Sequence, residues 1–156
     1  MIFLPSGGIE MYLTVYGIAI KLALVGWVLL LVSLFLARIR RFAWPLAQFV
    51  IPAIFGLLYV LMVWDGRHAL DLPGSFTTFP GIDALLQNDS ALTAAWIHIM
   101  AMDMFAGAWM AQDGIARGIP SALLLVLLIL TFAFGPSGLL LYILVRFALR
   151  PRTRPD

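Results

Sequence analysis

Residues 91–111, ALTAAWIHIMAMDMFAGAWMA, are apolar over enough length to cross a bilayer, and they contain one carboxylate, Asp103. A charged side chain near the middle of a membrane span costs about 2.5–3.5 kcal/mol on insertion scales. Such a carboxylate therefore faces a partner, a cavity or a ligand, or it is buried in its neutral form. The sequence predicts a membrane-spanning helix. Asp103 and His98, five residues earlier, are the ionisable side chains that a plain hydrophobic anchor would not contain.

The composition indicates an integral membrane protein. The chain has 156 residues, of which 63% are hydrophobic and 12% are charged, whereas soluble domains carry about 25% charged residues. No segment outside the apolar runs is long enough to build a separate soluble core, so we predict a single polytopic membrane domain over residues 1–156. The first residues lack the basic region and cleavage site of a signal peptide, and we expect the first span to act as its own insertion signal.

Four apolar segments predict an all-α membrane protein, a small bundle of four transmembrane helices. Each segment reaches the roughly 20 residues that a spanning helix needs, and none alternates as a barrel strand would. The fourth segment contains Gly135-Pro136-Ser137-Gly138, where we expect the helix to be kinked or broken. The expected spans cover residues 11–37, 44–64, 91–111 and 121–149.

The Gly-Pro-Ser-Gly sequence in the fourth segment leaves two interpretations open. About 13 apolar residues precede it and about 10 follow it, and each part is too short to span alone. The segment is therefore either one kinked, tilted helix or a re-entrant hairpin. A crossing helix divides the arginines almost evenly between the two sides, whereas a hairpin places all but one of them on a single side. Such an excess is typical of cytoplasmic loops.

Charge and cysteine content exclude several classes of function. All but one of the ten basic residues are arginines, and most are clustered beside apolar segments, which is typical of anchors to anionic headgroups. P-loop, RNA-binding and zinc patterns are absent, so nucleic acid is not an expected partner. The lack of cysteine excludes disulfides, thiolate metal sites and iron–sulfur clusters. His98 has no second histidine or cysteine at a ligand spacing, and we expect neither a metal nor a cofactor.

Asp103 shares one helix face with Trp96, Met100 and Gly107. Gly107 would let a neighbouring backbone or a flat ligand approach closely. Asp103 is then either a structural carboxyl group that is hydrogen-bonded to another helix, or a group that orients a ligand or transfers a proton. His98 lies about 140° around the helix from Asp103 and aligns with Trp109 instead.

Two further charged residues have a structural and a functional interpretation. Lys21, the single lysine, falls within the first expected span. It is either a counter-ion for Asp103 or a side chain that extends to the membrane interface. Asp113, in Gln112-Asp113-Gly114, is expected at a solvated helix end with a glycine cap.

Motifs in the second half of the chain are similar to those of a known family. They are, in chain order, Trp96-Ile-His98, Asp103-Met-Phe105-Ala-Gly107, Trp109, Asp113-Gly114 and Phe134-Gly135-Pro136-Ser-Gly138-Leu-Leu. As a set they resemble the abscisic-acid-deficient-four-like membrane proteins, over roughly Phe76 to Arg146 and more loosely over the first two spans. One position departs from the family pattern, because Ala108 stands where an arginine is usual.

The resemblance implies a function on a carotenoid. Plant members of the family are needed to form neoxanthin from violaxanthin, an isomerisation of a xanthophyll epoxide that needs an acid and a base but no redox cofactor. It implies a multi-pass protein of the bacterial inner membrane, or of a photosynthetic membrane, that binds and isomerises a carotenoid or similar polyene lipid. The candidate catalytic residues are Asp103 and His98, and the candidate ligand-binding residues are Lys21, Trp96, Met100, Phe105, Gly107, Trp109 and Asp113.

Two other functions are compatible with the sequence. The protein could be a non-enzymatic accessory subunit of a larger, photosynthetic membrane complex, or a homo-oligomer, that uses the same surface for a partner helix or a pigment. It could also be a small proton-coupled transporter with Asp103 as its proton site. The chain contains no inverted repeat, so a transporter would have to dimerise.

Overall fold

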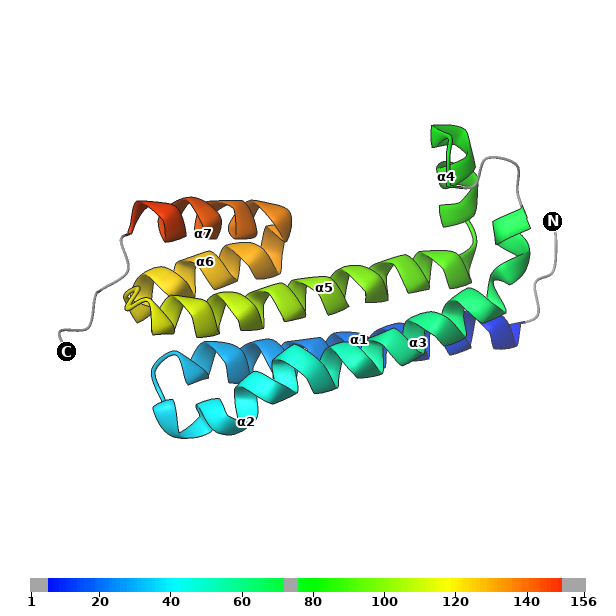
Figure 1. Cartoon of the computed structure of the whole chain (residues 1–156). Helices are drawn as coiled ribbons and strands as arrows, with labels where there is room; N and C mark the ends of the chain where they lie inside the picture. The colour runs from blue at the N-terminus through cyan, green and yellow to red at the C-terminus, as the bar shows by residue number, and fades with distance from the viewer. Residues whose placement is uncertain (1–5, 72–75, 150–156) are drawn as a thin grey trace. The chain divides into compact units, whose positions relative to one another are not determined.

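The structure, a computed structural model, describes residues 6–71 and 76–149, and within these ranges the regular elements are all helical (Figure 1). Three helical segments are long and apolar enough to cross a membrane: Gly8–Ser33, Ala37–Asp65 and Asp89–Ala116. They correspond to the first three predicted spans. At most 33% of the residues in the most apolar part of each are buried. Most residues in these apolar segments are therefore at least partly exposed at the surface of the protein, as expected of helices that face lipid.

The first and third of these segments are regular α-helices, α1 (Ser6–Ser33) and α5 (Asp89–Ala116). The second is composite: a 3-10 turn (Ala37–Ile39) leads into α2 (Arg40–Pro45), a π-helical turn η2 (Leu46–Val50) and α3 (Ile51–Asp65). Pro52 has no N–H to donate to the carbonyl of Gln48, four residues back, so the α-helical pattern cannot continue unchanged there. The wider π turn lies at this point.

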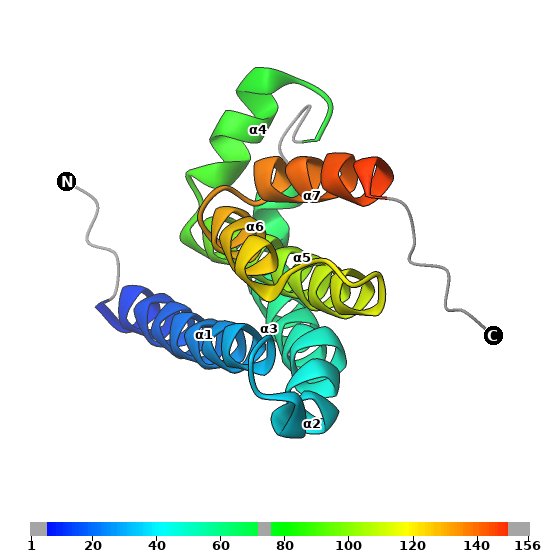
Figure 2. The ribbon, with the colours of Figure 1, turned by 90° about the vertical axis from the view of Figure 1, so that its left-hand side faces the viewer.

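The predicted fourth span is two helices in the structure, α6 (Ser121–Phe134) and α7 (Pro136–Ala148). Figures 1 and 2 both show them side by side, so the chain reverses direction at Gly135. Gly135 has φ +44° and ψ −99°, a conformation that a residue with a Cβ rarely adopts, and Pro136 starts α7 with a preset φ. The predicted break is therefore present as a helical hairpin, and a fourth spanning helix is not confirmed.

The hairpin closes through one very close approach. A Cβ added to Gly138 would lie 2.3 Å from the backbone nitrogen of Thr131 and 2.4 Å from its Oγ1. Thr131 itself is fully buried, and its hydroxyl donates to the carbonyl of Leu127 at 2.9 Å. Only glycine fits at position 138 while α6 and α7 keep this spacing.

The chain divides into two compact units, and α1, α3 and α5 each contribute residues to both. Unit 1 comprises Met1–Leu22 and Ala53–Ala101, and unit 2 comprises Ala23–Pro52 and Met102–Asp156, as far as the structure describes them. The single domain that the sequence predicts stays a prediction.

Unit 1 contains the N-terminal part of α1, most of α3, the 3-10 turn Arg67–Asp71, the short helix α4 (Phe79–Leu86) and the beginning of α5. Thr78 caps α4, because its side-chain oxygen accepts the N–H of Gly81 at 3.2 Å. The Ser90 hydroxyl donates to the carbonyl of Met62 at 2.7 Å and joins α5 to α3. Polar contacts therefore cap α4 and join the start of α5 to α3 in this unit.

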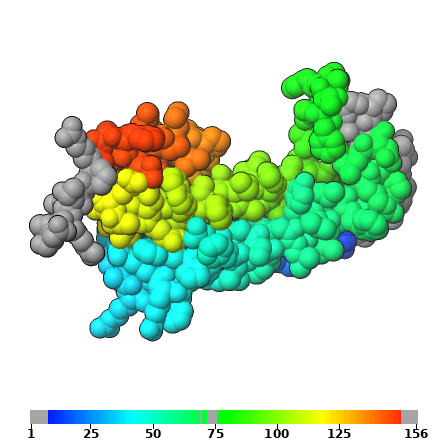
Figure 3. All heavy atoms as spheres, viewed as in Figure 1, coloured from blue at the N-terminus to red at the C-terminus, as the bar shows by residue number. Residues whose placement is uncertain are grey.

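Unit 2 contains the rest of α1, the segment from Ala37 to Pro52, the C-terminal part of α5, and the α6–α7 hairpin. Its core is apolar, with Leu30, Ile51, Met104, Leu128 and Tyr142 fully buried. In the space-filling view, the cyan atoms of the region around α2 adjoin the yellow atoms at the end of α5 (Figure 3). Helix α2 and the end of α5 are therefore neighbours in unit 2.

Candidate functional site

A groove in unit 1 contains Trp96, one of the predicted ligand-binding residues. Its volume is about 440 Å³, within the range of pockets that hold small ligands. We call it the Trp96 groove. It is lined by Ile9, Tyr12, Leu13, Tyr16, Asp89, Leu92, Thr93 and Trp96.

Helical spacing explains how two segments supply this lining. Asp89, Leu92 and Trp96 lie three and four residues apart on α5 and therefore face the same side. Tyr12 and Tyr16 lie four residues apart on α1 and do the same. Trp96 is 44% exposed, so the groove is open along its indole ring.

The Trp96 groove is polar at one end. The Tyr12 hydroxyl donates to Asp65 Oδ2 at 2.7 Å, which ties α1 to the end of α3. Asp89 is the first residue of α5, and the hydroxyl of Thr93 donates to its backbone carbonyl at 2.7 Å. The groove therefore combines a carboxylate and a phenol at the helix ends with aromatic and aliphatic walls farther along.

Asp103 lies on α5 in unit 2 and is not among the residues that line the Trp96 groove. Its carboxylate packs against the reversal at Gly135: a Cβ on that glycine would be 3.0 Å from Oδ1 and 3.2 Å from Oδ2. Within residues 6–71 and 76–149, no hydrogen bond or ion pair involves Asp103. The space beside its carboxylate exists because residue 135 has no side chain.

His98 and Lys21 are exposed in unit 1. The ring centroid of His98 lies 5.8 Å from that of Tyr59, in a tilted arrangement. Lys21 forms no ion pair among the residues that the structure describes. Neither side chain lines the Trp96 groove, and their predicted roles stay predictions.

The remaining predicted ligand residues on α5 have different surroundings. Met100 is half-buried and Phe105 is exposed. Gly107 is buried beneath the indole of Trp27, and a Cβ there would lie 2.5 Å from Trp27 Cη2. Trp27 in turn meets Phe132 edge-on, with ring centroids 5.4 Å apart. The flat group that approaches Gly107 is thus a side chain of the same protein.

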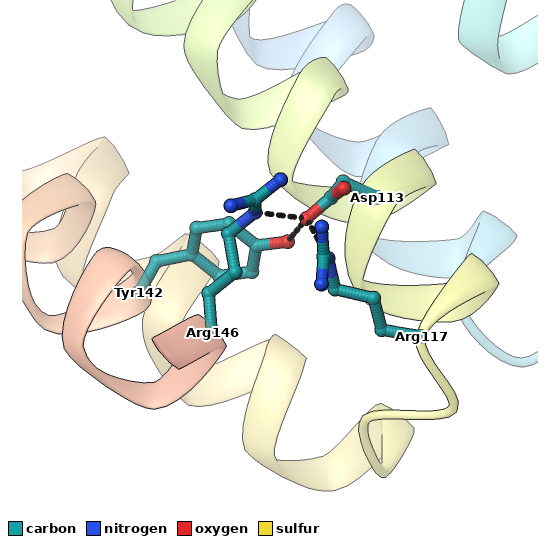
Figure 4. A network of polar contacts seen from close by, with 4 residues as sticks. All are labelled: Asp113, Arg117, Tyr142 and Arg146. Carbon is teal, nitrogen blue, oxygen red and sulfur yellow. Dashed lines mark hydrogen bonds and ion pairs between the residues drawn. The ribbon is translucent and has the colours of Figure 1, made fainter. Parts of the chain in front are cut away.

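Asp113 is the centre of a polar network between α5 and α7 (Figure 4). Its Oδ2 accepts hydrogen bonds from the Tyr142 hydroxyl, from Arg146 Nε at 2.9 Å and from Arg117 Nε at 2.8 Å. The Asp113 side chain is 19% exposed. Trp109 completes the cluster, with its ring 5.3 Å from that of Tyr142 and 5.8 Å from the Arg146 guanidinium.

The expectation that Asp113 lies at a solvated helix end is therefore wrong. Helix α5 continues to Ala116, and Gly114 lies inside it, where a Cβ would be 2.3 Å from Leu124 Cδ2. The glycine with positive φ that follows the helix is Gly118, at φ 74°. Asp113 is instead a half-buried acceptor that fixes the end of α7 to α5.

Sequence reasoning missed Arg117, Tyr142 and Arg146 as partners of Asp113. A local signal existed, since Arg117 follows Asp113 by four residues, and Arg146 follows Tyr142 by four. The contact between the two pairs depends on the direction of the hairpin. Ala108, which stands where the family pattern has an arginine, is fully buried.

The part of the chain that the structure describes contains no cluster of three or more histidine, cysteine, aspartate or glutamate side chains that could hold a metal ion.

Comparison with known proteins identifies one match. A family model described as ABA DEFICIENT 4-like matches residues 14–142, which is more than half of the chain. The matched range includes Tyr16 and Trp96 of the Trp96 groove, Asp103, and the Asp113–Tyr142 contact. No curated protein and no solved structure matches the chain.

Proposed function

Because the chain belongs to the ABA DEFICIENT 4-like family, as its motifs predicted, we propose that it is a multi-pass membrane protein that binds a hydroxylated polyene lipid of the carotenoid type. One end group of the polyene occupies the Trp96 groove, and the rest of the chain extends among the lipids. The proposed location is the bacterial inner membrane or a photosynthetic membrane.

The observation that carries this proposal is the polarity gradient along the Trp96 groove. Leu13, Tyr16 and Trp96 provide a largely apolar, aromatic wall suited to a conjugated chain or a methylated ring. Asp89 and Tyr12, at the ends of their helices, provide the acceptor and the hydroxyl that a ring hydroxyl group would meet. The Tyr12 oxygen can still accept a hydrogen bond beside the one that it donates to Asp65, and the exposed Asp89 carboxylate can accept another, so a ring hydroxyl group has partners here that a plain acyl chain cannot use.

The activity that we propose to follow binding is isomerisation of a xanthophyll epoxide to an allenic alcohol. This reaction protonates the epoxide oxygen and removes a carbon-bound proton, so substrate and product have the same formula. Asp89 is the carboxylate that lines the groove and is the first candidate for the proton acceptor. Asp103, which lies beside Gly135 outside the groove lining, is the second candidate.

The binding experiment uses the full-length protein in lipid nanodiscs, titrated with violaxanthin and with β-carotene, which lacks ring hydroxyl groups. We expect saturable binding with violaxanthin preferred, observed as quenching of tryptophan fluorescence and induced circular dichroism of the polyene. Trp96→Leu should weaken the affinity at least about fivefold, as expected when one well-packed aromatic contact with the ligand is lost. Trp64→Leu is the matched control, because Trp64 is 70% exposed and lies outside the groove.

Equal affinity of the two variants, or no preference for the hydroxylated polyene, would contradict binding in this groove. Turnover is followed by chromatography of the extracted pigment. We expect Asp89→Asn to abolish formation of the allenic product while the bound pigment remains. Turnover that survives in Asp89→Asn and is lost in Asp103→Asn would transfer the role to Asp103. Purification of a colourless protein together with other membrane subunits would favour the accessory-subunit alternative.

A further inference from the structure

A second groove lies in unit 2, where α2 and the π-helical turn meet α5, and the proposed function does not use it. Its volume is about 260 Å³. We propose that this groove binds the phosphate headgroup of an anionic phospholipid, and we call it the Arg41 groove. The side chains that carry the argument are Arg40, Arg41, Trp44, Gln48, Phe49 and Gln112.

The charge of the Arg41 groove is positive and uncompensated. Arg40 is held in place, since its Nε donates to the carbonyl of Ser33 at 2.9 Å and one of its terminal nitrogens donates to that of Leu34 at 3.0 Å. Arg41 is exposed and has no hydrogen bond or ion pair to any other described residue. No carboxylate is among the lining residues. A guanidinium group can donate two parallel hydrogen bonds to two oxygens of one phosphate, so a groove with two arginines and no carboxylate suits a phosphate group.

Neutral donors complete the polar side of the groove. Gln112 Nε2 donates to Gln48 Oε1 at 2.7 Å, which links α5 to the π-helical turn. The Gln48 amide nitrogen then keeps two donors that are not used by another described residue. A phosphate oxygen is an acceptor that these donors could bind in addition to the arginines.

The backbone around Gln48 supports a site rather than a chance gap. Gln48 and Phe49 belong to the π-helical turn Leu46–Val50, and Pro45 directly precedes it. Single π turns within α-helices are frequent at functional sites. Here the wider turn supplies two of the lining side chains.

Two features favour a lipid over a free anion: the position of the groove near the ends of spanning segments, and its apolar wall. It is formed just after the first spanning segment ends at Ser33 and the second begins at Ala37, which is where a chain emerges at the membrane surface. Trp44 donates its indole N–H to Ser33 Oγ at 3.1 Å, and Phe49 is 60% exposed. An acyl chain can lie along these rings while the headgroup contacts the arginines.

The test is native mass spectrometry of the full-length protein in mild detergent. Phosphatidylglycerol, phosphatidylcholine and inorganic phosphate are the probes. We expect one phosphatidylglycerol to bind in preference to phosphatidylcholine, and millimolar inorganic phosphate to leave it bound. Arg41→Gln should lower the affinity for phosphatidylglycerol about tenfold, as expected for loss of a charge-assisted hydrogen bond.

Arg38→Gln is the matched control. Arg38 is an exposed arginine three residues earlier, it is not among the lining residues, and its replacement removes the same charge. We expect its affinity to stay close to that of the unchanged protein. Circular dichroism melts should show that both variants fold, because neither arginine makes a hydrogen bond within the described chain. Equal losses in the two variants, equal binding of the two lipids, or displacement by inorganic phosphate would overturn the proposal.

Discussion

Two glycines of unit 2 and two of unit 1 lie in opposite surroundings. In unit 2, a Cβ on Gly107 would lie 2.5 Å from the indole of Trp27, and a Cβ on Gly138 would lie 2.3 Å from the backbone of Thr131. In unit 1, a Cβ on Gly17 or on Gly56 would meet no described atom within 4 Å. Small residues in membrane helices allow close packing. Gly107 and Gly138 serve this purpose in unit 2, whereas Gly17 and Gly56 of unit 1 have open space beside them.

Gly138→Ala should give the largest loss of stability, because the added methyl group meets backbone atoms that cannot move aside as a flexible side chain could. We expect the free energy of unfolding to fall by about 3 kcal/mol, the upper part of the range for overpacking. Denaturant titration in detergent micelles, followed by circular dichroism, measures this change. Gly56→Ala is the control, and an equal loss there would show that the difference between the units is not real.

Asp113→Asn should give the next largest effect. The amide cannot accept three hydrogen bonds at one oxygen as the carboxylate does, and two arginines lose their counter-charge. We expect a loss of about 2 kcal/mol in the same unfolding measurement, as is typical when a charged hydrogen-bond partner is removed. The control is Asp83→Asn, whose exposed carboxylate accepts one bond from Gln87. A change below about 0.5 kcal/mol in both variants would mean that the network does not fix α7 to α5.

Tyr12→Phe tests the polar contact of unit 1 and should have a smaller effect. It removes the hydrogen bond to Asp65 at an exposed helix end. The expected loss is about 1 kcal/mol, the usual net contribution of one hydrogen bond. Tyr16→Phe changes the same chemical group on the same helix, but no described residue accepts a hydrogen bond from Tyr16. Matching thermal shifts in the two variants would argue against a structural role for the Tyr12–Asp65 pair.

Gly17→Ala should have the smallest effect, and its sign differs. With no described neighbour, the methyl group costs no packing and reduces the freedom of the unfolded chain, so we expect a gain of about 0.5–1 kcal/mol. A clear loss of stability, seen only in the native membrane and not in detergent, would reveal a partner helix on this face. That outcome would favour the accessory-subunit alternative or a homo-oligomer.

The three spanning segments were predictable because their length and hydropathy are local properties of the sequence. The Gly-Pro-Ser-Gly break was also visible, but not its outcome, since the choice between a kink and a hairpin depends on whether Gly138 can reach Thr131. This contact brings α6 and α7 together, and no pattern within either segment predicts it.

The polar partners were the least predictable part. Asp113 and Tyr142 are 29 residues apart in the chain, and their contact requires the reversal at Gly135. The close approach at Gly107 followed from residue size alone, but Trp27 as the group that fills it lies in another helix. Asp103 was singled out because a charged side chain within a membrane span costs free energy. That cost predicts a structural or functional role for Asp103, but it does not indicate which residues lie beside it.

The π-helical turn also determines the rotational phase of the second spanning segment. Ala43, Ala47 and Ile51 are buried at intervals of four residues. In a regular α-helix such a stripe drifts by about 40° at each step, because each residue advances about 100°. A wider turn between Ala47 and Ile51 reduces this drift and keeps all three on one face. Deletion of one residue from Leu46–Val50 would therefore rotate α2 by about 100° and carry Arg41 away from its groove, with almost no change in composition.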